Sequence, residues 1–373
     1  MPSIEVLGTG VVYRNPMPHL CSRHAYFPSL VELPGGQLLC AMDIGCAFEA
    51  VDVRSCVCRS GDGGKTWSEP RMIFNPDESG HPVSTTCRIS RMPDGAIVGL
   101  ACLFDRSRAD AGLSNPATDG FVRTDMAITR SGDGGNTWST PQLITPGIRW
   151  QHFETCSPVI PTTATRWLAP SSLWPDWEGK CPLGAHKAVA FLSDDGGRTW
   201  PRVVDVMDGS AERTSGWEQK QVRLSDGRLM AVCWRFDFRA MQNRVNGYAF
   251  SVNNGESYGK PLDSPLHGET CTPVALGDNR VLCVYRRMDQ RGLWAHLARI
   301  DGDRWLPLAD APLWGTNVEA HQTGLESILG QMSTLRFGCP SVIQRADGEV
   351  FAAFWCVEDC VSNIRWLRLK VNG

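Results

Sequence analysis

The chain alternates short β-rich, largely apolar runs with two-residue turns, and this arrangement occurs six times. Each unit is a β-rich run, a turn such as Gly-Gly, Asp-Gly or Asp-Asn, and a second β-rich run, as in FPSLVELPGGQLLCAMD and TCTPVALGDNRVLCVYRRMD. This sequence pattern is typical of a β-hairpin. The pattern therefore predicts six hairpins, which begin near Phe27, Thr86, Thr155, Glu218, Thr270 and Cys339.

A third β-rich run in units one to four leads into an eight-residue segment that is itself repeated. It reads SGDGGKTW at 60–67, SGDGGNTW at 131–138, SDDGGRTW at 193–200 and, more loosely, SVNNGESY at 251–258. The glycines permit positive φ, an aspartate can accept hydrogen bonds from the turn amides, and the aromatic ring can pack on a neighbouring unit. We interpret the segment as structural and expect no chemistry from Asp62, Asp133 or Asp194.

Six units of about 60 residues, each contributing two hairpins, fit a six-bladed β-propeller. The sixth unit lacks a fourth strand, whereas the chain opens with a spare one, IEVLGTGVVY at 4–13. We therefore expect an all-β propeller that forms a single domain over residues 1–373. Its N-terminal strand should complete the last blade and close the ring.

Charge and hydropathy narrow the classes of partner. The formal net charge of −3 gives no electrostatic reason to expect nucleic acid or an anionic membrane surface. No apolar run approaches the roughly 20 residues that span a bilayer, and MPSIEVLGTG lacks the basic start and apolar stretch of a secretion signal. We expect a cytoplasmic protein with neither a nucleic-acid nor a membrane partner.

Fifteen cysteines could form a disulfide framework, but the residues around them do not favour one. Many lie in apolar, strand-like runs such as QLLCAMD, RLMAVCW and RVLCVY, where a thiol behaves as a small buried hydrophobe. Their number is odd, and no His or Cys pair stands at zinc-like spacing near Cys56 and Cys58. We expect reduced structural thiols, no metal and no cofactor, with a few disulfides or a redox role as alternatives.

The repeated S-x-D-x-G-x-T-W segment resembles the Asp box, and several copies on six blades are similar to the sialidase superfamily. The resemblance covers nearly the whole chain. It implies the propeller fold more strongly than an activity, because the box also occurs in other glycosidases, in lyases and in non-catalytic propellers. Function must therefore be sought at the site.

The first strands of all blades converge on the central channel of a propeller, so their starts share one mouth. Alignment on the turns places the six hairpin starts in one ring, with Tyr26, Thr85, Glu154, Trp217, Glu269 and Gly338 just ahead of them. Glu154, Glu218 and Glu269 are the carboxylates among these positions. The stretch EQKQVRLSDGRL is similar to the sialidase segment whose glutamate polarises a tyrosine nucleophile, which would assign that role to Glu218. The structural alternative is a carboxylate solvated in the channel.

The resemblance also implies an acid in the loop after the second strand of the first blade. The matching loop, DIGCAFEAVDVRS, offers Glu49 and Asp52, and residue type favours Asp52 although spacing does not decide. Family substrates carry a carboxylate held by three arginines, because a guanidinium makes two parallel bonds to it. The candidates for substrate binding are Arg23, Arg88, Arg235 and Arg287.

Two departures from the family pattern affect the reaction centre. The chain has Tyr26-Phe27-Pro28 where family members have Arg-Ile-Pro, which leaves Arg23 as the nearest substitute. No tyrosine stands near Cys339, where the sixth blade should supply the nucleophile. We therefore expect the same frame with a different reaction centre.

Three functions fit these residues. The favoured one is a glycoside hydrolase for an acidic or terminal sugar, with paired carboxylates drawn from Glu218, Glu154, Glu269 and Asp52. The second is a lyase for a uronic-acid linkage, in which Arg23 or Arg235 neutralises the uronate and His24, Tyr26 or His152 takes the proton. The third is a propeller that only binds a glycan or a protein, with Trp150, Trp174, Trp177 and Trp217 as stacking surfaces.

Overall fold

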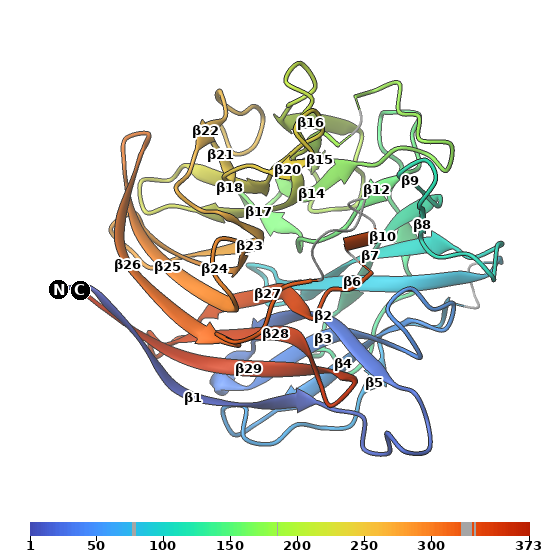
Figure 1. The fold of residues 1–373 in the computed structure, drawn as a ribbon, viewed down its shortest axis with the longest axis horizontal. Coiled ribbons are helices and arrows are strands. Elements are labelled where there is room, and N and C mark those ends of the chain that lie inside the picture. Colours follow the sequence, from blue (N-terminus) through green and yellow to red (C-terminus); the bar gives the residue numbers. More distant parts are fainter. Residues whose placement is uncertain (77–79, 185, 322–329, 332) are drawn as a thin grey trace.

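Six antiparallel sheets are arranged around a central channel (Figure 1). The computed structural model describes residues 1–76, 80–184, 186–321, 330–331 and 333–373. The six-bladed propeller predicted from the hairpin count is confirmed. Each blade begins with its innermost strand and runs outward, so the chain returns to the axis at the start of every unit.

The strands of the blades follow the chain in order. Blade one has β2 (His24–Glu32), β3 (Leu38–Gly45), β4 (Arg54–Ser60) and β5 (Arg71–Met72); blade two has β6 (Val83–Arg91), β7 (Ile97–Asp105), β10 (Thr124–Ser131) and β11 (Gln142–Leu143). Blade three has β12 (Phe153–Glu154), β13 (Ile160–Pro161), β14 (Trp167–Leu173), β15 (Ala188–Ser193) and β16 (Arg202–Met207). Blade four has β17 (Trp217–Arg223), β18 (Leu229–Trp234), β21 (Gly247–Ser251) and β22 (Leu262–Asp263); blade five has β23 (Gly268–Ala275), β24 (Arg280–Arg287), β25 (Leu293–Asp301) and β26 (Arg304–Trp314). Two short hairpins, β8 (Ser114–Asn115) with β9 (Gly120–Phe121) and β19 (Phe236–Asp237) with β20 (Gln242–Asn243), and the 3-10 turn η1 (Pro34–Gly36) complete these elements.

Blade six joins the two ends of the chain. It contains β27 (Phe337–Gln344), β28 (Val350–Glu358), β29 (Val361–Asn372) and, as its outermost strand, β1 (Ser3–Tyr13). The register runs from Ser3 opposite Asn372 to Tyr13 opposite Ile364. Gly10 is required in this pairing, because a Cβ at that position would lie 2.6 Å from the ring of Trp366. The predicted closure of the ring by residues 4–13 is thus confirmed.

The six main hydrophobic clusters each lie between two neighbouring blades. Leu39 of blade one packs with Ile89 of blade two in one cluster, and Leu293 of blade five packs with Phe354 of blade six in another. Both faces of a blade are therefore covered. This explains why a central strand of a blade, such as β7 with the sequence IVGLACLFD, is an almost continuous apolar run and not an alternating one.

The repeated eight-residue segment is a structural turn, as its composition predicts. In the second copy, Asp133 accepts hydrogen bonds from the Thr137 amide at 3.0 Å and from the Thr137 hydroxyl at 2.6 Å. These bonds hold the pKa of Asp133 well below its usual range. Gly135 has a φ of 87° and lies so close to blade one that a Cβ would be 2.6 Å from Leu39. The segment therefore ties its own turn together and seats it on the preceding blade.

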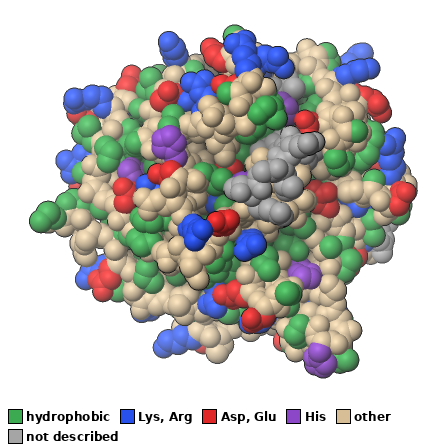
Figure 2. All heavy atoms as spheres, in the orientation of Figure 1, with side chains coloured by type: hydrophobic (Ala, Val, Ile, Leu, Met, Phe, Trp, Pro, Cys, Tyr) green, Lys and Arg blue, Asp and Glu red, His purple; other side chains and the backbone are tan. Residues whose placement is uncertain are grey.

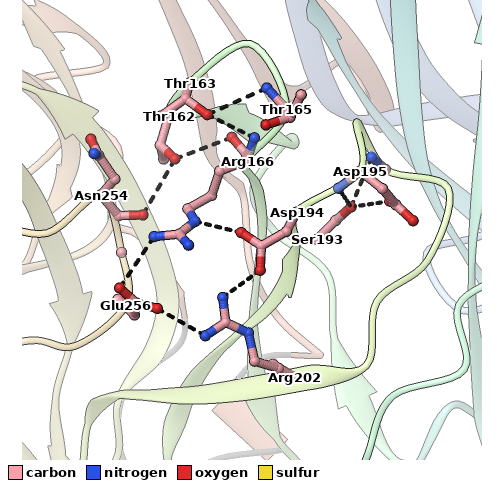
Figure 3. Close-up of polar contacts among 12 residues, drawn as sticks. Thr162, Thr163, Thr165, Arg166, Ser193, Asp194, Asp195, Arg202, Asn254 and Glu256 are labelled. Atoms are coloured by element: carbon pink, nitrogen blue, oxygen red, sulfur yellow. Dashed lines mark hydrogen bonds and ion pairs between the residues drawn. The ribbon is translucent and has the colours of Figure 1, made fainter.

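The third copy corrects one expectation. Asp195, and not Asp194, accepts the hydrogen bonds from the Thr199 amide and hydroxyl, because Asp195 is the residue two positions after the box serine. Asp194 instead forms ion pairs with Arg166 at 2.6 Å and Arg202 at 2.5 Å (Figure 3). Both arginines also reach Glu256 of the fourth box. Arg166 and Arg202 therefore connect blades three and four, and Asp194 holds both arginines.

All fifteen cysteines are unpaired thiols in the structure. Most are buried, and Cys40 faces Cys58 across two adjacent strands of blade one. Acidic and basic side chains are interspersed over the face seen in Figure 2 and form no large patch of one sign there. Within the described part of the chain, no helix has the length and hydropathy needed to cross a membrane.

Candidate active site

The innermost strands of four blades carry a β-bulge at the position that the turn alignment assigns to the ring. The register of β2, β17, β23 and β27 against its partner shifts there. The bulged residues have left-handed φ values, 53° at Phe27, 49° at Glu218, 53° at Thr270 and 43° at Cys339. A bulge re-aims a side chain, and a non-glycine residue with this backbone is strained. Four blades thus use a strained backbone position to direct a side chain into the channel.

All six ring residues predicted from the hairpins line one cavity of about 110 Å³. Three of the residues just ahead of them, Tyr26, Thr85 and Glu154, also line it. Glu269 and Trp217 are not among its described lining residues. The ring geometry inferred from turn alignment is therefore present, and it brings two of the three candidate carboxylates to the cavity.

Aromatic rings form two walls of this cavity. Tyr26, Phe27, Phe48 and Trp355 contact one another with ring centroids 5.0 to 6.4 Å apart. Phe121 and Trp174 also line the cavity and stack at 4.0 Å. Aromatic faces of this kind suit the C–H surfaces of a small organic ligand. The polar lining groups come from several blades, with Arg88 on β6, Glu154 on β12 and Glu218 on β17.

A second cavity, of about 630 Å³, lies further along the same six inner strands. It is lined by later residues of those strands, among them Ser29, Lys220 and Ser341. Arg88, Cys156 and Cys339 border both cavities. These three side chains lie between the two spaces and form a floor for the first cavity.

Glu154 and Glu218 form a close pair of carboxyl groups across blades three and four. Glu154 Oε2 accepts a hydrogen bond from the backbone N–H of Glu218 at 2.6 Å, and carboxylate oxygens of the two residues lie within 4.8 Å of each other. Burial, followed by the charge of Glu218, raises the pKa of Glu154 to about 7. Two like charges at this distance cannot both form easily. The pair therefore shares a proton near neutral pH, and the cations beside Glu218 favour Glu154 as the member that holds it.

Glu218 lies in a different electrostatic environment. Burial raises its pKa, but the cations Lys220 and Arg286 act in the opposite direction and favour its ionised form. Its Oε1 is 3.7 Å from the thiol of Cys339, while its buried Oε2 has no hydrogen-bond partner among the described residues. Sequence reasoning did not single out Lys220, although it is the one cation near the start of the inner strand WEQKQVR. Glu218 thus points an unpartnered oxygen at the cavity.

Asp43 and Arg88 form a second buried charged group. Asp43 accepts hydrogen bonds from Ser55 at 3.0 Å and from Thr86, and Arg88 Nη1 lies 3.4 Å from its carboxylate. Burial, opposed mainly by Arg88, raises the pKa of Asp43 to about 6. Arg88 lines the cavity, as the sequence analysis expected of a binding arginine. Asp43 was missed, although a carboxylate inside the apolar run LLCAMDIG is itself an unusual signal.

Arg286 is the second arginine at the cavity, and it is held by Glu269. Its Nε and Nη2 donate to Glu269 Oε2 at 3.0 and 2.6 Å, and its Nη1 donates to the Phe337 carbonyl at 2.7 Å. Gly338 allows this approach, because a Cβ there would be 2.2 Å from Arg286 Nη1. Asn243 donates to the other oxygen of Glu269 at 2.7 Å. Glu269 therefore neutralises Arg286 behind the cavity wall.

The loop after the second strand of blade one places Glu49, and not Asp52, at the cavity. Glu49 lines it and accepts a hydrogen bond from the Leu113 amide at 2.7 Å, and burial raises its pKa. Asp52 is exposed and accepts from the Cys46 amide of its own loop at 3.1 Å. The preference for Asp52 rested on residue type, whereas the path of the loop brings Glu49 inward.

Three of the four candidate binding arginines lie away from the cavity. Arg235 pairs with Asp263, and Arg287 pairs with Asp289 at 2.7 Å. Arg23 is exposed. Strand alternation turns Arg286 inward and its neighbour Arg287 outward, so the expectation for blade five was one residue out of register.

The residues of the lyase interpretation do not assemble at one place. Tyr26 lines the cavity, and burial raises its pKa. His24 stacks behind it at 6.2 Å and accepts a hydrogen bond from the Ser362 amide. His152 borders a separate space of about 570 Å³, lined by residues of blades two and three, with its Nδ1 3.1 Å from the Phe121 carbonyl. Trp217 is buried and donates to His186.

Among the described residues, one group has the donor atoms for a metal ion. Potential ligand atoms of Glu154, Cys156 and Glu218 lie within 4.8 Å of one another. Burial raises the pKa of the Cys156 thiol well above its usual value, and Glu154 carries a proton near neutrality. The group as it stands is thus better suited to sharing protons than to binding a cation, which needs deprotonated ligands.

The blades, the Asp-box turns and the ring of inner-strand residues define a propeller of the sialidase-like superfamily. The chain belongs to the family described as "BNR repeat-like domain", which matches residues 36–351. A sialidase from Micromonospora viridifaciens is 29% identical over 249 residues, or 62% of this chain, and the chain spans only 35% of that protein's length.

Solved structures share the fold at low sequence identity. A Dyadobacter fermentans protein of unknown function superimposes with a TM-score of 0.76 at 20% identity, covering all of both chains. The Penicillium chrysogenum α-L-arabinanase complexed with arabinobiose gives a TM-score of 0.67 at 14% identity and 98% of each chain. The K499G mutant of the NanB sialidase from Streptococcus pneumoniae gives a TM-score of 0.65 at 11% identity, with 96% of this chain and 70% of the other covered.

Proposed function

We propose that this propeller is a retaining glycoside hydrolase that removes a terminal sugar. The observation that carries the proposal is the Glu154–Glu218 pair, whose carboxylate oxygens lie within 4.8 Å at an aromatic-walled pocket. Retaining glycosidases place their two carboxyl groups about 5 to 5.5 Å apart, and inverting enzymes leave about 6.5 to 9.5 Å for a water molecule. The pocket's floor supports action at a chain end.

The two environments assign the two roles. Glu154 holds a proton near neutrality and would donate it to the oxygen of the leaving group. Glu218, with cations favouring its ionised form and Oε2 free of partners, would attack the anomeric carbon and form a glycosyl ester. Glu154, now ionised, would then remove a proton from water, which displaces Glu218. Each step conserves charge within the pair.

The residue at the family's nucleophile position supports a carboxylate nucleophile. Cys339 occupies that place, and burial raises the pKa of its thiol to about 12. A thiol rather than a thiolate is present at neutral pH, and a thiol is a poor nucleophile. The relatives also fit the proposal, because proteins with this fold include a sialidase and an arabinanase.

The anomeric outcome tests the proposal. We expect the first-formed product to keep the configuration of the substrate, because two displacements at one carbon restore it. Proton NMR spectra recorded within the first turnovers, before mutarotation, distinguish the two anomers. A product of inverted configuration would contradict the nucleophile role of Glu218, and an unsaturated uronate product would establish the lyase instead.

The pH dependence of kcat/KM follows from the pair. Glu154 must be protonated to act as an acid, and its folded-state pKa of about 7 lies above its ordinary value. Activity should therefore fall as the pH rises through about 7. It should also fall in acid, where Glu218 loses its charge, so that the profile is bell-shaped with macroscopic pKa values that belong to the pair. A value of kcat/KM that stays constant from about pH 6 to about pH 9 would contradict Glu154 as the acid.

A further inference from the structure

We infer that the sugar unit bound in this pocket is electrically neutral, an inference that rests on the proposed function and concerns the same site. Among the residues that the structure describes, the charged groups that line the pocket are two arginines, Arg88 and Arg286, and four carboxylates, Asp43, Glu49, Glu154 and Glu218. An anionic sugar would need a cation that is not already paired. Neither arginine meets this condition.

The guanidinium group of Arg286 already donates its hydrogen bonds to protein groups. Its Nε and Nη2 both donate to Glu269, and its Nη1 donates to the Phe337 carbonyl. Only 2% of the side chain is exposed. A substrate carboxylate would have to displace Glu269 from this two-bond contact and leave that carboxylate buried without its cation, which is strongly unfavourable.

Arg88 is neutralised in the same manner by Asp43. Its guanidinium lies 3.4 Å from the Asp43 carboxylate, donates to the Phe27 carbonyl at 3.1 Å, and stacks over the Phe27 ring at 5.2 Å. Asp43 is buried and has no other ionic partner among the described residues. The first blade contributes the uncharged side chains of Tyr26 and Phe27 to the wall beside it.

After these pairings, three carboxylates of the lining remain, those of Glu49, Glu154 and Glu218. Lys220 near Glu218 and Arg106 near Glu49 offset part of their charge, but neither cation is among the described lining residues. Even with a proton on Glu154, the lining carries excess negative charge. A substrate carboxylate would be repelled, because bringing like charges together in a desolvated site is unfavourable. The formal charge of the pocket therefore selects against an acidic sugar.

The unpartnered polar atoms indicate what the pocket does bind. Three buried oxygens of its lining residues have no hydrogen-bond partner in the described part of the chain, namely Thr155 Oγ1, Thr270 Oγ1 and Glu218 Oε2. The hydroxyl groups can donate and accept, and the carboxylate oxygen accepts. Sugar hydroxyls complement all three, while the aromatic walls face the apolar side of the ring. A neutral sugar thus satisfies groups that are otherwise buried at a cost.

Matched substrates test this inference on the unaltered protein. We would compare kcat/KM for 4-nitrophenyl glucosides with the corresponding glucuronides, and galactosides with galacturonides, in both anomers, since each pair differs only in the carboxylate at C6. An arabinofuranoside and a sialoside extend the range. We expect neutral members to be favoured by about 100-fold or more, the factor that a like-charge penalty of this kind produces.

A binding measurement keeps the inference separate from catalysis. Calorimetric titration of the unaltered protein with methyl thioglycosides of the same pairs, which resist hydrolysis, reports on the pocket without turnover and with every lining carboxylate in place. Raising the salt concentration to about 0.5 M, which shortens the Debye length from its value of about 10 Å at 0.1 M, should leave neutral binding unchanged.

The outcomes distinguish the inference from the proposed function. Preference for the acidic members in either assay, or no binding of any sugar, would overturn the inference. Cleavage of acidic substrates alone would overturn it while leaving the hydrolase intact. Selective binding of neutral sugars without any cleavage by the unaltered protein would support it and reject the proposed hydrolysis.

Discussion

Glu218→Gln is expected to lower kcat by about 10² to 10⁴-fold with little change in the fold, because glutamine keeps the shape of the side chain but cannot form the glycosyl ester. The bulged backbone at Glu218 has a φ of 49° and does not depend on the charge of the side chain. Steady-state kinetics on the best glycoside found, together with a circular dichroism spectrum, measures both properties.

The matched controls are two residues that the sequence also suggested. Asp52→Asn changes an exposed carboxylate on its own loop, and His152→Ala changes a residue that borders a different cavity. Both variants should turn over at close to the unaltered rate. Full activity of Glu218→Gln, or a severe loss in His152→Ala, would remove the carboxylate pair from the reaction.

Glu154→Gln separates the acid from the nucleophile. This substitution should lower the rate of glycosidic bond cleavage more for substrates with poor leaving groups than for 4-nitrophenyl glycosides. A good leaving group needs no proton from an acid. In this variant, kcat/KM should no longer fall as the pH rises through about 7. An equal loss for both kinds of leaving group would instead indicate a structural role for Glu154.

Glu269→Ala is expected to lower the free energy of unfolding by about 3 to 5 kcal/mol, because it leaves the buried guanidinium of Arg286 without its counter-charge. The two side chains are only 2% and 3% exposed. The midpoint and slope of urea unfolding, followed by tryptophan fluorescence, give the difference.

Asp289→Ala is the control for that change. Asp289 pairs with Arg287, the neighbour of Arg286, but its side chain is 43% exposed. An exposed pair contributes about 0 to 1 kcal/mol. Equal effects of the two substitutions would show that the Glu269–Arg286 pair is not the buried group that we describe.

The architecture could be predicted from the chain because its causes are local. Turn residues and β-rich runs recur in every unit, and the spare strand at 4–13 has one open partner, β29. Alignment on those turns also placed Glu154 and Glu218 at the channel, since every inner strand starts at the same end of the blade. The confusion of Asp194 with Asp195 was avoidable, because the spacing from Ser193 distinguishes them.

The site required more than local information. Glu49 and Asp52 lie in one loop, and only the path of that loop decides which carboxylate reaches the cavity. Arg286 and Arg287 are adjacent, and only the seating of β24 in the ring turns one inward. A one-residue shift in a strand reverses the face of the sheet, and composition carries no record of it.

Periodicity and turn chemistry in the sequence were thus sufficient to determine six blades, their order and the residues nearest the axis, because each follows from a few neighbouring residues. Tertiary structure alone decided the charge state of the pocket. The pKa of Glu154 rises because Glu218, 64 residues away, is brought against it in a buried place. Arg286 is neutralised because Glu269 lies opposite it on the neighbouring strand. Residues that are remote in the chain come close together, and water is excluded around them, only when the ring of blades is closed.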